Sequence, residues 1–206
     1  MLIVLAPALT AAELTVTSRD QNGAAVEDLV VWLTPLDAPL PPAPPAGTLQ
    51  AVVEQQGEEF NPYVIAVRTG TTVEFPNRDD VQHHVYSLSR PAQFEIPLHS
   101  GNTHESYTFN QAGLVPVGCN IHDWMLSYIV VIDGPWFGRS GPDGTIRLAD
   151  VPPGRYKLEG WHPRVRANAE QEITLGESDP TALALDLRLR PDRRIRRAPT
   201  GSGRGY

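Results

Sequence analysis

The sequence predicts an all-β fold. Twenty prolines and 17 glycines among 206 residues interrupt the chain too often for long helices, and no window sustains a helical repeat of apolar residues. Many short runs instead alternate apolar and polar residues, as strands with one buried face do. A chain of this length has room for one or two domains, and we expect two small β-sandwich cores.

The first 12 residues are apolar and end in small residues. This pattern predicts a secretory signal peptide cleaved after Ala12, with a buried first strand as the alternative. No basic residue precedes the apolar run, which indicates a truncated leader. The run is too short to span a bilayer as a helix, and no other stretch is long and apolar enough, so we expect no transmembrane segment. The expected location is the periplasm or the outside of the cell.

Residues 13–36 are expected to contain two strands, at 13–18 and 28–34. The Asp-Gln-Asn-Gly turn at residues 20–23 predicts that they form a hairpin, because Asn-Gly favours a tight hairpin turn. Residues 37–47 are rich in proline and are expected to form a stiff linker. Residues 48–133 hold enough alternating runs for about eight strands, a complete sandwich without the first hairpin.

Residues 134–190 supply further strands for that hairpin. Period-two runs occur at 145–150, 155–160, 170–175 and 181–189. The turn segments are Asp-Gln-Asn-Gly at 20–23, Asp143-Gly144, Val-Pro-Pro-Gly-Arg-Tyr at 151–156 and Trp-His-Pro at 161–163. Together they resemble the carboxypeptidase-regulatory-like, transthyretin-like β-sandwich. The resemblance implies a small sandwich without catalytic machinery, built from residues 13–36 and 134–190 and split by residues 48–133.

The candidate site contains the single cysteine of the chain. Cys119 is followed by His122 and Met125, on a loop between expected strands at 113–119 and 127–133. The adjacent His83 and His84 lie upstream in an apolar, strand-like run. A thiolate, two imidazoles and a weak thioether are the ligand set of a blue-copper electron-transfer site. We therefore expect one copper ion per chain.

Three alternatives fit this motif less well. A lone cysteine is most often a small buried apolar residue, but the histidine and methionine at ligand spacing disfavour that reading here. A structural zinc site usually has more than one thiolate and rarely takes methionine. A nucleophilic Cys-His pair is conceivable, but ligands on a hairpin loop suit metal capture better than a catalytic cleft.

The two motifs also resemble a known family. The Cys-x2-His-x2-Met spacing, together with residues 60–77 and 80–86, is similar to the cupredoxins, the family of plastocyanin, amicyanin and pseudoazurin. The resemblance covers about residues 48–133, and the loop has the short spacing of amicyanin. It implies a Greek-key β-sandwich. Two departures are His84, where the family usually has asparagine, and Ile121, where proline is common.

The resemblance also implies roles for individual residues. Aligning His-His-Val with the family's His-Asn-Val places His83 on the ligand position, and His83, Cys119 and His122 would hold copper in one plane with Met125 axial. His84 would support the ligand loop by a hydrogen bond, or replace His83 as the ligand. His122 would face the surface as the electron exit, inside an apolar docking patch framed by Trp124 and Met125.

The function expected from these features is one-electron transfer by a type 1 (blue) copper protein, not an enzyme. One alternative is a copper storage, delivery or assembly module without redox turnover. Another is an extracellular binding or adhesion protein with an accessory copper domain. His99, His104 and His162 have no partner at ligand spacing and are expected at the surface or at strand edges.

Charge gives hints about partners. The formal net charge is −7, while the tail at residues 191–206 holds five arginines and one aspartate. We expect this tail to be disordered. The acidic remainder favours a basic redox partner, such as a cytochrome or a dehydrogenase, and disfavours nucleic acid.

Overall fold

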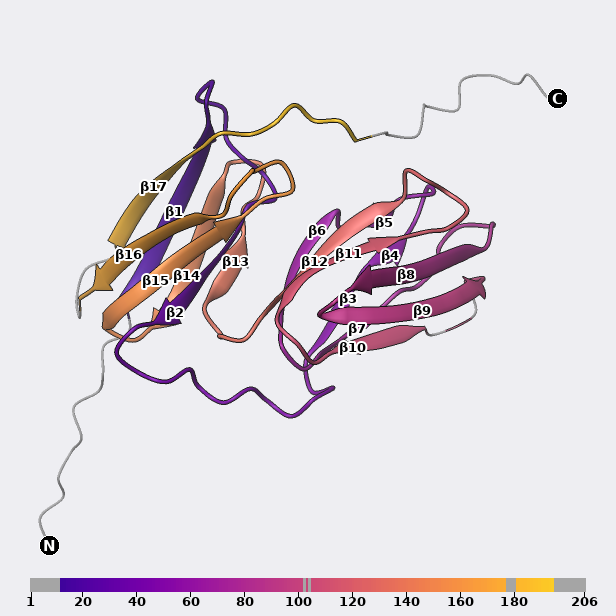
Figure 1. Cartoon of the computed structure of the whole chain (residues 1–206), viewed down its shortest axis with the longest axis horizontal. Coiled ribbons are helices and arrows are strands. Elements are labelled where there is room, and N and C mark those ends of the chain that lie inside the picture. The colour runs from indigo at the N-terminus through magenta and orange to yellow at the C-terminus, as the bar shows by residue number, and fades with distance from the viewer. Residues whose placement is uncertain (1–11, 102, 104, 177–180, 195–206) are drawn as a thin grey trace, which may run out of the picture.

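The computed structural model describes residues 12–101, 103, 105–176 and 181–194. Within these ranges the chain contains strands and no helix, which confirms the predicted all-β class (Figure 1). In chain order the strands are β1 (Ala12–Asp20), β2 (Val30–Pro35), β3 (Gln50–Val52), β4 (Glu54–Gln55), β5 (Phe60–Asn61), β6 (Val64–Arg68), β7 (Thr71–Glu74), β8 (His83–Ser89), β9 (Ala92–His99), β10 (Ser106–Phe109), β11 (Gly113–Gly118), β12 (Leu126–Ile132), β13 (Phe137–Arg139), β14 (Thr145–Val151), β15 (Gly154–Trp161), β16 (Ala169–Leu175) and β17 (Thr181–Leu187). No helix in the described part of the chain could cross a membrane.

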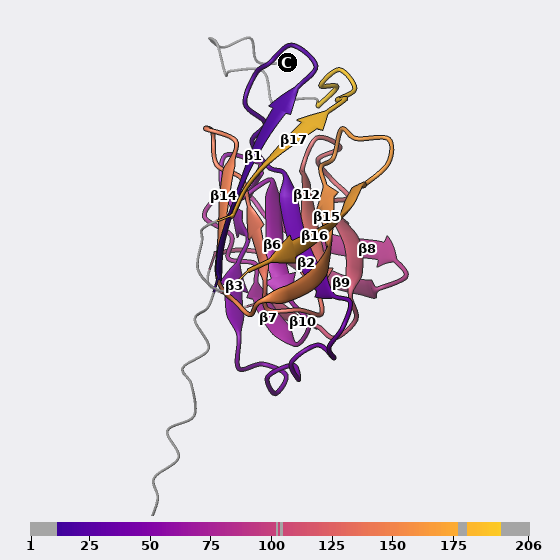
Figure 2. The same cartoon turned by 90° about the vertical axis from the view of Figure 1, so that its left-hand side faces the viewer.

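The two ends of the described chain build one pair of sheets. One sheet has the order β14-β1-β17, and the other has the order β13-β2-β15-β16. Strand β1 alternates as its sequence requires, with Leu14 and Val16 fully buried between exposed or half-buried neighbours. These side chains share a core with Leu33 of β2 and Leu158 of β15, so the two sheets face each other (Figures 1 and 2).

The expected hairpin between the first two strands is wrong. The turn itself forms, because Gly23 adopts φ 81° and its N–H donates to the Asp20 carbonyl over 2.9 Å. However, β1 pairs with β14 and β17, while β2 pairs with β13 and β15 in the opposite sheet. After the turn the chain passes from one sheet to the other, and Val26 and Leu29 of this connection are buried in the core between them.

Strands β3 to β12 build the second pair of sheets. Their orders are β10-β7-β3 and β6-β12-β11-β8-β9, and the two-residue strands β4 and β5 pair separately. Phe75 and Phe109 are fully buried between the sheets, together with Ile129 of β12. Phe94 stacks on Tyr107 with ring centres 4.2 Å apart. This second sandwich carries all of the proposed ligands.

Strand β12 is buried on both faces and joins the two sandwiches. Ile129 and Val131 belong to the core of the second sandwich. Val130 and Ile132 point the other way and pack in a separate cluster with Val30 of β2. Such two-sided burial explains the continuous apolar run at residues 128–132 of this strand.

The remaining predicted segments follow the surface or fall outside the described residues. In the linker, the carbonyls of Pro41 and Pro42 accept hydrogen bonds from the Arg68 guanidinium, at 2.8 and 3.0 Å. Of the predicted signal peptide, only Ala12 is described, and it begins β1 with 4% exposure. Of the predicted basic tail, only residues 191–194 are described, and the Arg194 guanidinium lies 4.1 Å from the centre of the Tyr63 ring.

Candidate metal centre

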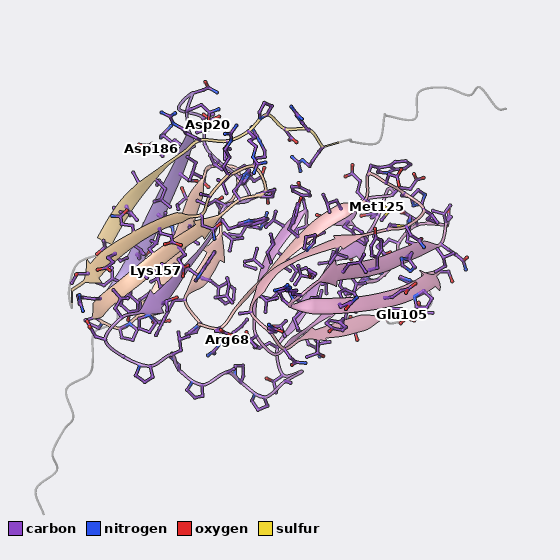
Figure 3. The ribbon with its side chains drawn as sticks, in the orientation of Figure 1. Asp20, Arg68, Glu105, Met125, Lys157 and Asp186 are labelled. Carbon is purple, nitrogen blue, oxygen red and sulfur yellow. The ribbon has the colours of Figure 1, made fainter. Side chains whose placement is uncertain are left out.

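The loop that carries the Cys-His-Met motif is closed by its flanking strands. Gly118, the last residue of β11, pairs with Leu126, the first residue of β12, so residues 119–125 form a tight connection. The Met125 N–H donates to the His122 carbonyl over 3.0 Å, which folds the loop back on itself. Cys119 and Met125 point into the core with 4% and 2% exposure. Figure 3 shows Met125 at one end of the second sandwich.

The first imidazole comes from the neighbouring strand. His83 begins β8, which pairs with β11 through Tyr86 and Gly118. Its Nδ1 lies 3.2 Å from Nδ1 of His122, and Sγ of Cys119 lies 3.8 Å from the same His122 atom. One ligand atom from each of His83, Cys119 and His122 therefore lies within 4.8 Å of the others.

Asp79 fixes the orientation of the His83 ring. Its Oδ2 lies 2.8 Å from Nε2 of His83, a ring with no exposed surface. Because an ionised carboxylate can only accept hydrogen bonds, His83 donates its Nε2–H to Asp79, and in the neutral ring the lone pair of Nδ1 faces the cluster. Burial acts to raise the pKa of Asp79, but hydrogen bonds from the Glu58 N–H, the His83 ring and the Gly57 N–H outweigh it and lower that pKa.

His122 is the more accessible of the two clustered imidazoles. Its side chain is 16% exposed, and its Nε2 lies 4.0 Å from Oε2 of Glu58. The Trp124 ring lies 5.2 Å from the His122 ring and donates its Nε1–H to the Glu58 carbonyl over 3.0 Å. The apolar docking patch around His122 was expected to include Met125, but Met125 is buried and cannot contribute to it. The exposed apolar side chain beside His122 is Ile121, at 50% exposure.

His84 lies outside the three-residue cluster. Its Nε2 is 2.8 Å from Oε1 of Glu95 on the neighbouring strand β9. This hydrogen bond differs from the expected one, which would have joined His84 to the ligand loop. The pairing of β8 with β9 is irregular between His83 and Val85, and both histidines are buried. Nδ1 of His84 has no hydrogen-bond partner among the described residues.

His99 and His162 are buried and not at the surface, but His99 lies on β9, the edge strand of its sheet, as the expectation of strand-edge positions allowed. His99 is 5% exposed, and its Nε2 lies 3.2 Å from the Phe75 carbonyl. His162 is 6% exposed, and its Nδ1 accepts the Arg164 N–H over 3.1 Å. Each ring contacts a backbone group, and Nε2 of His99 also lies 2.9 Å from Nε2 of Gln55. His104 lies outside the described residues.

The chemistry of the clustered atoms fits a soft or borderline metal ion. A cysteine sulfur and two imidazole nitrogens converge, with one imidazole held by a carboxylate in the way that metal-binding histidines usually are. Sequence reasoning did not single out Asp79 or Glu58 in these roles. The position of Asp79 four residues before His83 was a weak signal, and nothing local indicates that Glu58 faces His122.

No family model and no curated protein matches the chain. Among solved structures, it is similar to the copper-containing nitrite reductase of Thermus scotoductus SA-01, with 26% identity over 48% of this chain and a TM-score of 0.38. That match spans 25% of the nitrite reductase chain, well short of its length. A reduced mutant of amicyanin is 25% identical over 44% of this chain and 92% of its own, with a TM-score of 0.39. A purple cupredoxin from Nitrosopumilus maritimus is 20% identical over 41% of this chain and 99% of its own, with a TM-score of 0.35.

Proposed function

We propose that this protein binds one copper ion in a type 1 site and carries one electron at a time. The observation that supports the proposal is the convergence of His83, Cys119 and His122, whose ligand atoms all lie within 4.8 Å of one another in a largely buried site. Two imidazoles and one thiolate are the equatorial ligands of blue-copper centres. Met125, buried on the same loop, would supply a weak thioether ligand.

In this proposal the protein contributes a fixed set of ligands. Copper supplies the reversible one-electron couple. The pairing of Gly118 with Leu126 holds the ends of the ligand loop, and Asp79 holds the His83 ring. Because these supports come from a packed sandwich, they would hold the same ligand positions in both oxidation states of a bound copper ion and so keep reorganisation small. Cys119 would release its proton when the metal binds.

His122 is the proposed route for the electron. Its side chain is 16% exposed, compared with 0% for His83, and it lies beside Trp124 and the exposed Ile121. Glu58 and Asp123 place carboxylates near this edge, which supports a basic partner such as a small cytochrome or a dehydrogenase. We propose a periplasmic or secreted location, on the basis of the apolar N-terminal segment.

A copper titration tests this proposal directly. Cu(II) added to the purified protein should bind one per chain, give an intense visible thiolate-to-copper band and show the paramagnetic-resonance signal of a type 1 site. Cys119→Ser should abolish the band, while the far-ultraviolet circular dichroism of the all-β fold stays the same. A colourless Cu(II) complex of the unaltered protein contradicts the proposal. Rapid transfer of Cu(I) to an acceptor, without reversible redox cycling, would favour copper delivery instead.

A further inference from the structure

The Asp79 carboxylate contacts both His83 and the turn that lies beside His122. Oδ2 of Asp79 is 2.8 Å from Nε2 of His83 and accepts the Glu58 N–H over 2.8 Å, while its Oδ1 accepts the Gly57 N–H over 2.6 Å. The Asp79 side chain is 15% exposed. Asp79 thus receives hydrogen bonds from a proposed ligand and from a chain segment more than 20 residues away.

The carboxylate is itself held in place. The Asp79 N–H donates to Oδ1 of Asn77 over 2.9 Å. Asn77 is 2% exposed, and its Nδ2 donates to the carbonyls of Val81 and His99 at 2.8 and 2.9 Å. The loop between β7 and β8 therefore presents Asp79 to His83 in a preset position, as the supporting residues of metal ligands usually are.

The segment that Asp79 anchors lies over the second imidazole. Gln56 and Glu59 exchange backbone hydrogen bonds of 3.0 and 3.3 Å, and between them Gly57 and Glu58 adopt φ of 66° and 58°. This turn places Oε2 of Glu58 4.0 Å from Nε2 of His122. Nε2 of each clustered imidazole consequently faces a carboxylate. Asp79 is hydrogen-bonded directly to His83, and Glu58, which faces His122, lies on the turn that Asp79 holds.

We propose that Asp79 is a positioning residue that favours Cu(II) over Cu(I) at this site, acting directly on His83 and, through the turn at residues 56–59, on His122. This inference rests on the proposed copper function. A negative charge on the far side of a ligand imidazole makes the ring a stronger donor and stabilises the more highly charged metal ion. The reduction potential is therefore lower than it would be with a neutral partner.

The test compares Asp79→Asn with Asp80→Asn. Both changes remove one negative charge from adjacent residues, but Asp80 is exposed. Asp79→Asn should weaken Cu(II) binding about tenfold relative to Cu(I), in the range typical for residues that support ligands. For a one-electron couple this equals a rise of about 59 mV in reduction potential. Asp80→Asn should give less than a third of that rise, and both variants should keep the visible band. Equal rises in the two variants, or no rise in Asp79→Asn, overturn the proposal.

A measurement on the metal-free protein separates this proposal from the copper function. Nitrogen NMR of the histidines should show the His83 hydrogen on Nε2 in the unaltered protein and in Asp80→Asn. In Asp79→Asn the ring should populate both tautomers, and the Gly57 and Glu58 amides should exchange faster with solvent. An unchanged tautomer and unchanged exchange in Asp79→Asn contradict the role of Asp79, whatever the copper spectra show. A colourless copper complex of the unaltered protein, with these NMR changes present, would instead contradict only the copper function and the potential that depends on it.

Discussion

The Nδ1 atoms of His83 and His122 lie 3.2 Å apart, although 39 positions separate the residues in the chain. Asp79 accepts the Nε2–H of His83, so in the neutral His83 ring Nδ1 bears no hydrogen, and a hydrogen between the two Nδ1 atoms would come from His122. A bound cation would replace that hydrogen and accept both lone pairs. The pairing of β8 with β11 places the rings at this distance.

The neighbouring histidines should therefore respond differently to substitution. We expect His83→Ala to abolish the visible copper band, because it removes one of the converging nitrogens. It should also destabilise the metal-free protein by about 1–3 kcal/mol, because it leaves the buried side of Asp79 without its partner. Absorption spectra of the copper complex and denaturant unfolding of the metal-free form measure the two effects.

His84→Asn provides the matched control. It alters the adjacent buried residue, whose ring is bonded to Glu95 and lies outside the cluster. The copper band should persist with a similar intensity. The opposite pattern, in which His84→Asn loses the band and His83→Ala keeps it, would show that His84 is the ligand.

Met125→Leu tests the axial position. The volume of the side chain is nearly conserved at a site that is 2% exposed, so the stability of the metal-free protein should fall by less than about 1.5 kcal/mol. The blue colour should remain, because the equatorial ligands are intact, and the reduction potential should rise, because the thioether no longer donates to copper. Voltammetry measures the potential. An unchanged potential would mean that Met125 serves only in packing.

These residues also show which parts of the site could be predicted from sequence. Cys119, His122 and Met125 lie within one loop, so their spacing alone brings them together. The choice between His83 and His84 followed from strand alternation and from a family resemblance. The contact of Asp79 with His83 had only a weak sequence signal, the spacing of four residues. The place of Glu58 could not be predicted, because it depends on a contact between the β7–β8 loop and a turn 21 positions away.

The fold shows the same division between local and distant information. Alternation correctly predicted β1, whose Leu14 and Val16 are buried, and the Asn22-Gly23 turn forms where its residues favour it. The hairpin was wrong because turn chemistry does not decide which strands pair. In the structure, the partners of β1 lie more than 120 positions away, as the pairing of Val16 with Ile146 illustrates.

The two sandwiches are expected to fold as separate domains. A chain in which a short linker replaces residues 48–133 should retain a β-type circular dichroism spectrum and unfold cooperatively, because the described strands β1, β2 and β13–β17 pair with one another. It should also bind a hydrophobic dye more strongly than the full chain. Its Val30 would lose the contact with Val130 and Ile132, and each such side chain contributes about 1.5–3 kcal/mol when fully buried.

Residues 48–133 alone provide the converse test, and they should bind copper with the spectrum of the full chain. Disorder of the first chain, combined with independent folding of residues 48–133, would contradict the split-domain arrangement.

The free energy of unfolding should decrease as the pH is lowered, because of His162. Burial is the main cause that lowers the pKa of this ring, and the positive charges of Arg164 and Arg194 lower it further. The charge of Asp28 and a hydrogen bond with the Glu27 backbone raise it in part, and the resulting pKa is about 4. In the unfolded chain the ring has its ordinary pKa of about 6.5. Between these values the unfolded state binds the proton and the folded state does not, so the free energy of unfolding decreases as the pH falls.

The full effect of His162 is reached only below pH 4 and amounts to about 3 kcal/mol, since each pKa unit corresponds to about 1.4 kcal/mol. Urea unfolding of the metal-free protein between pH 4.5 and 7.5 measures the slope, and His162→Asn is the control. Asparagine does not titrate in this range, and its side-chain oxygen can still accept the Arg164 N–H that His162 accepts over 3.1 Å. The variant should lose less stability than the unaltered protein between pH 6.5 and 4.5. Parallel pH profiles of the two proteins would show that His162 is protonated equally in the folded and unfolded states.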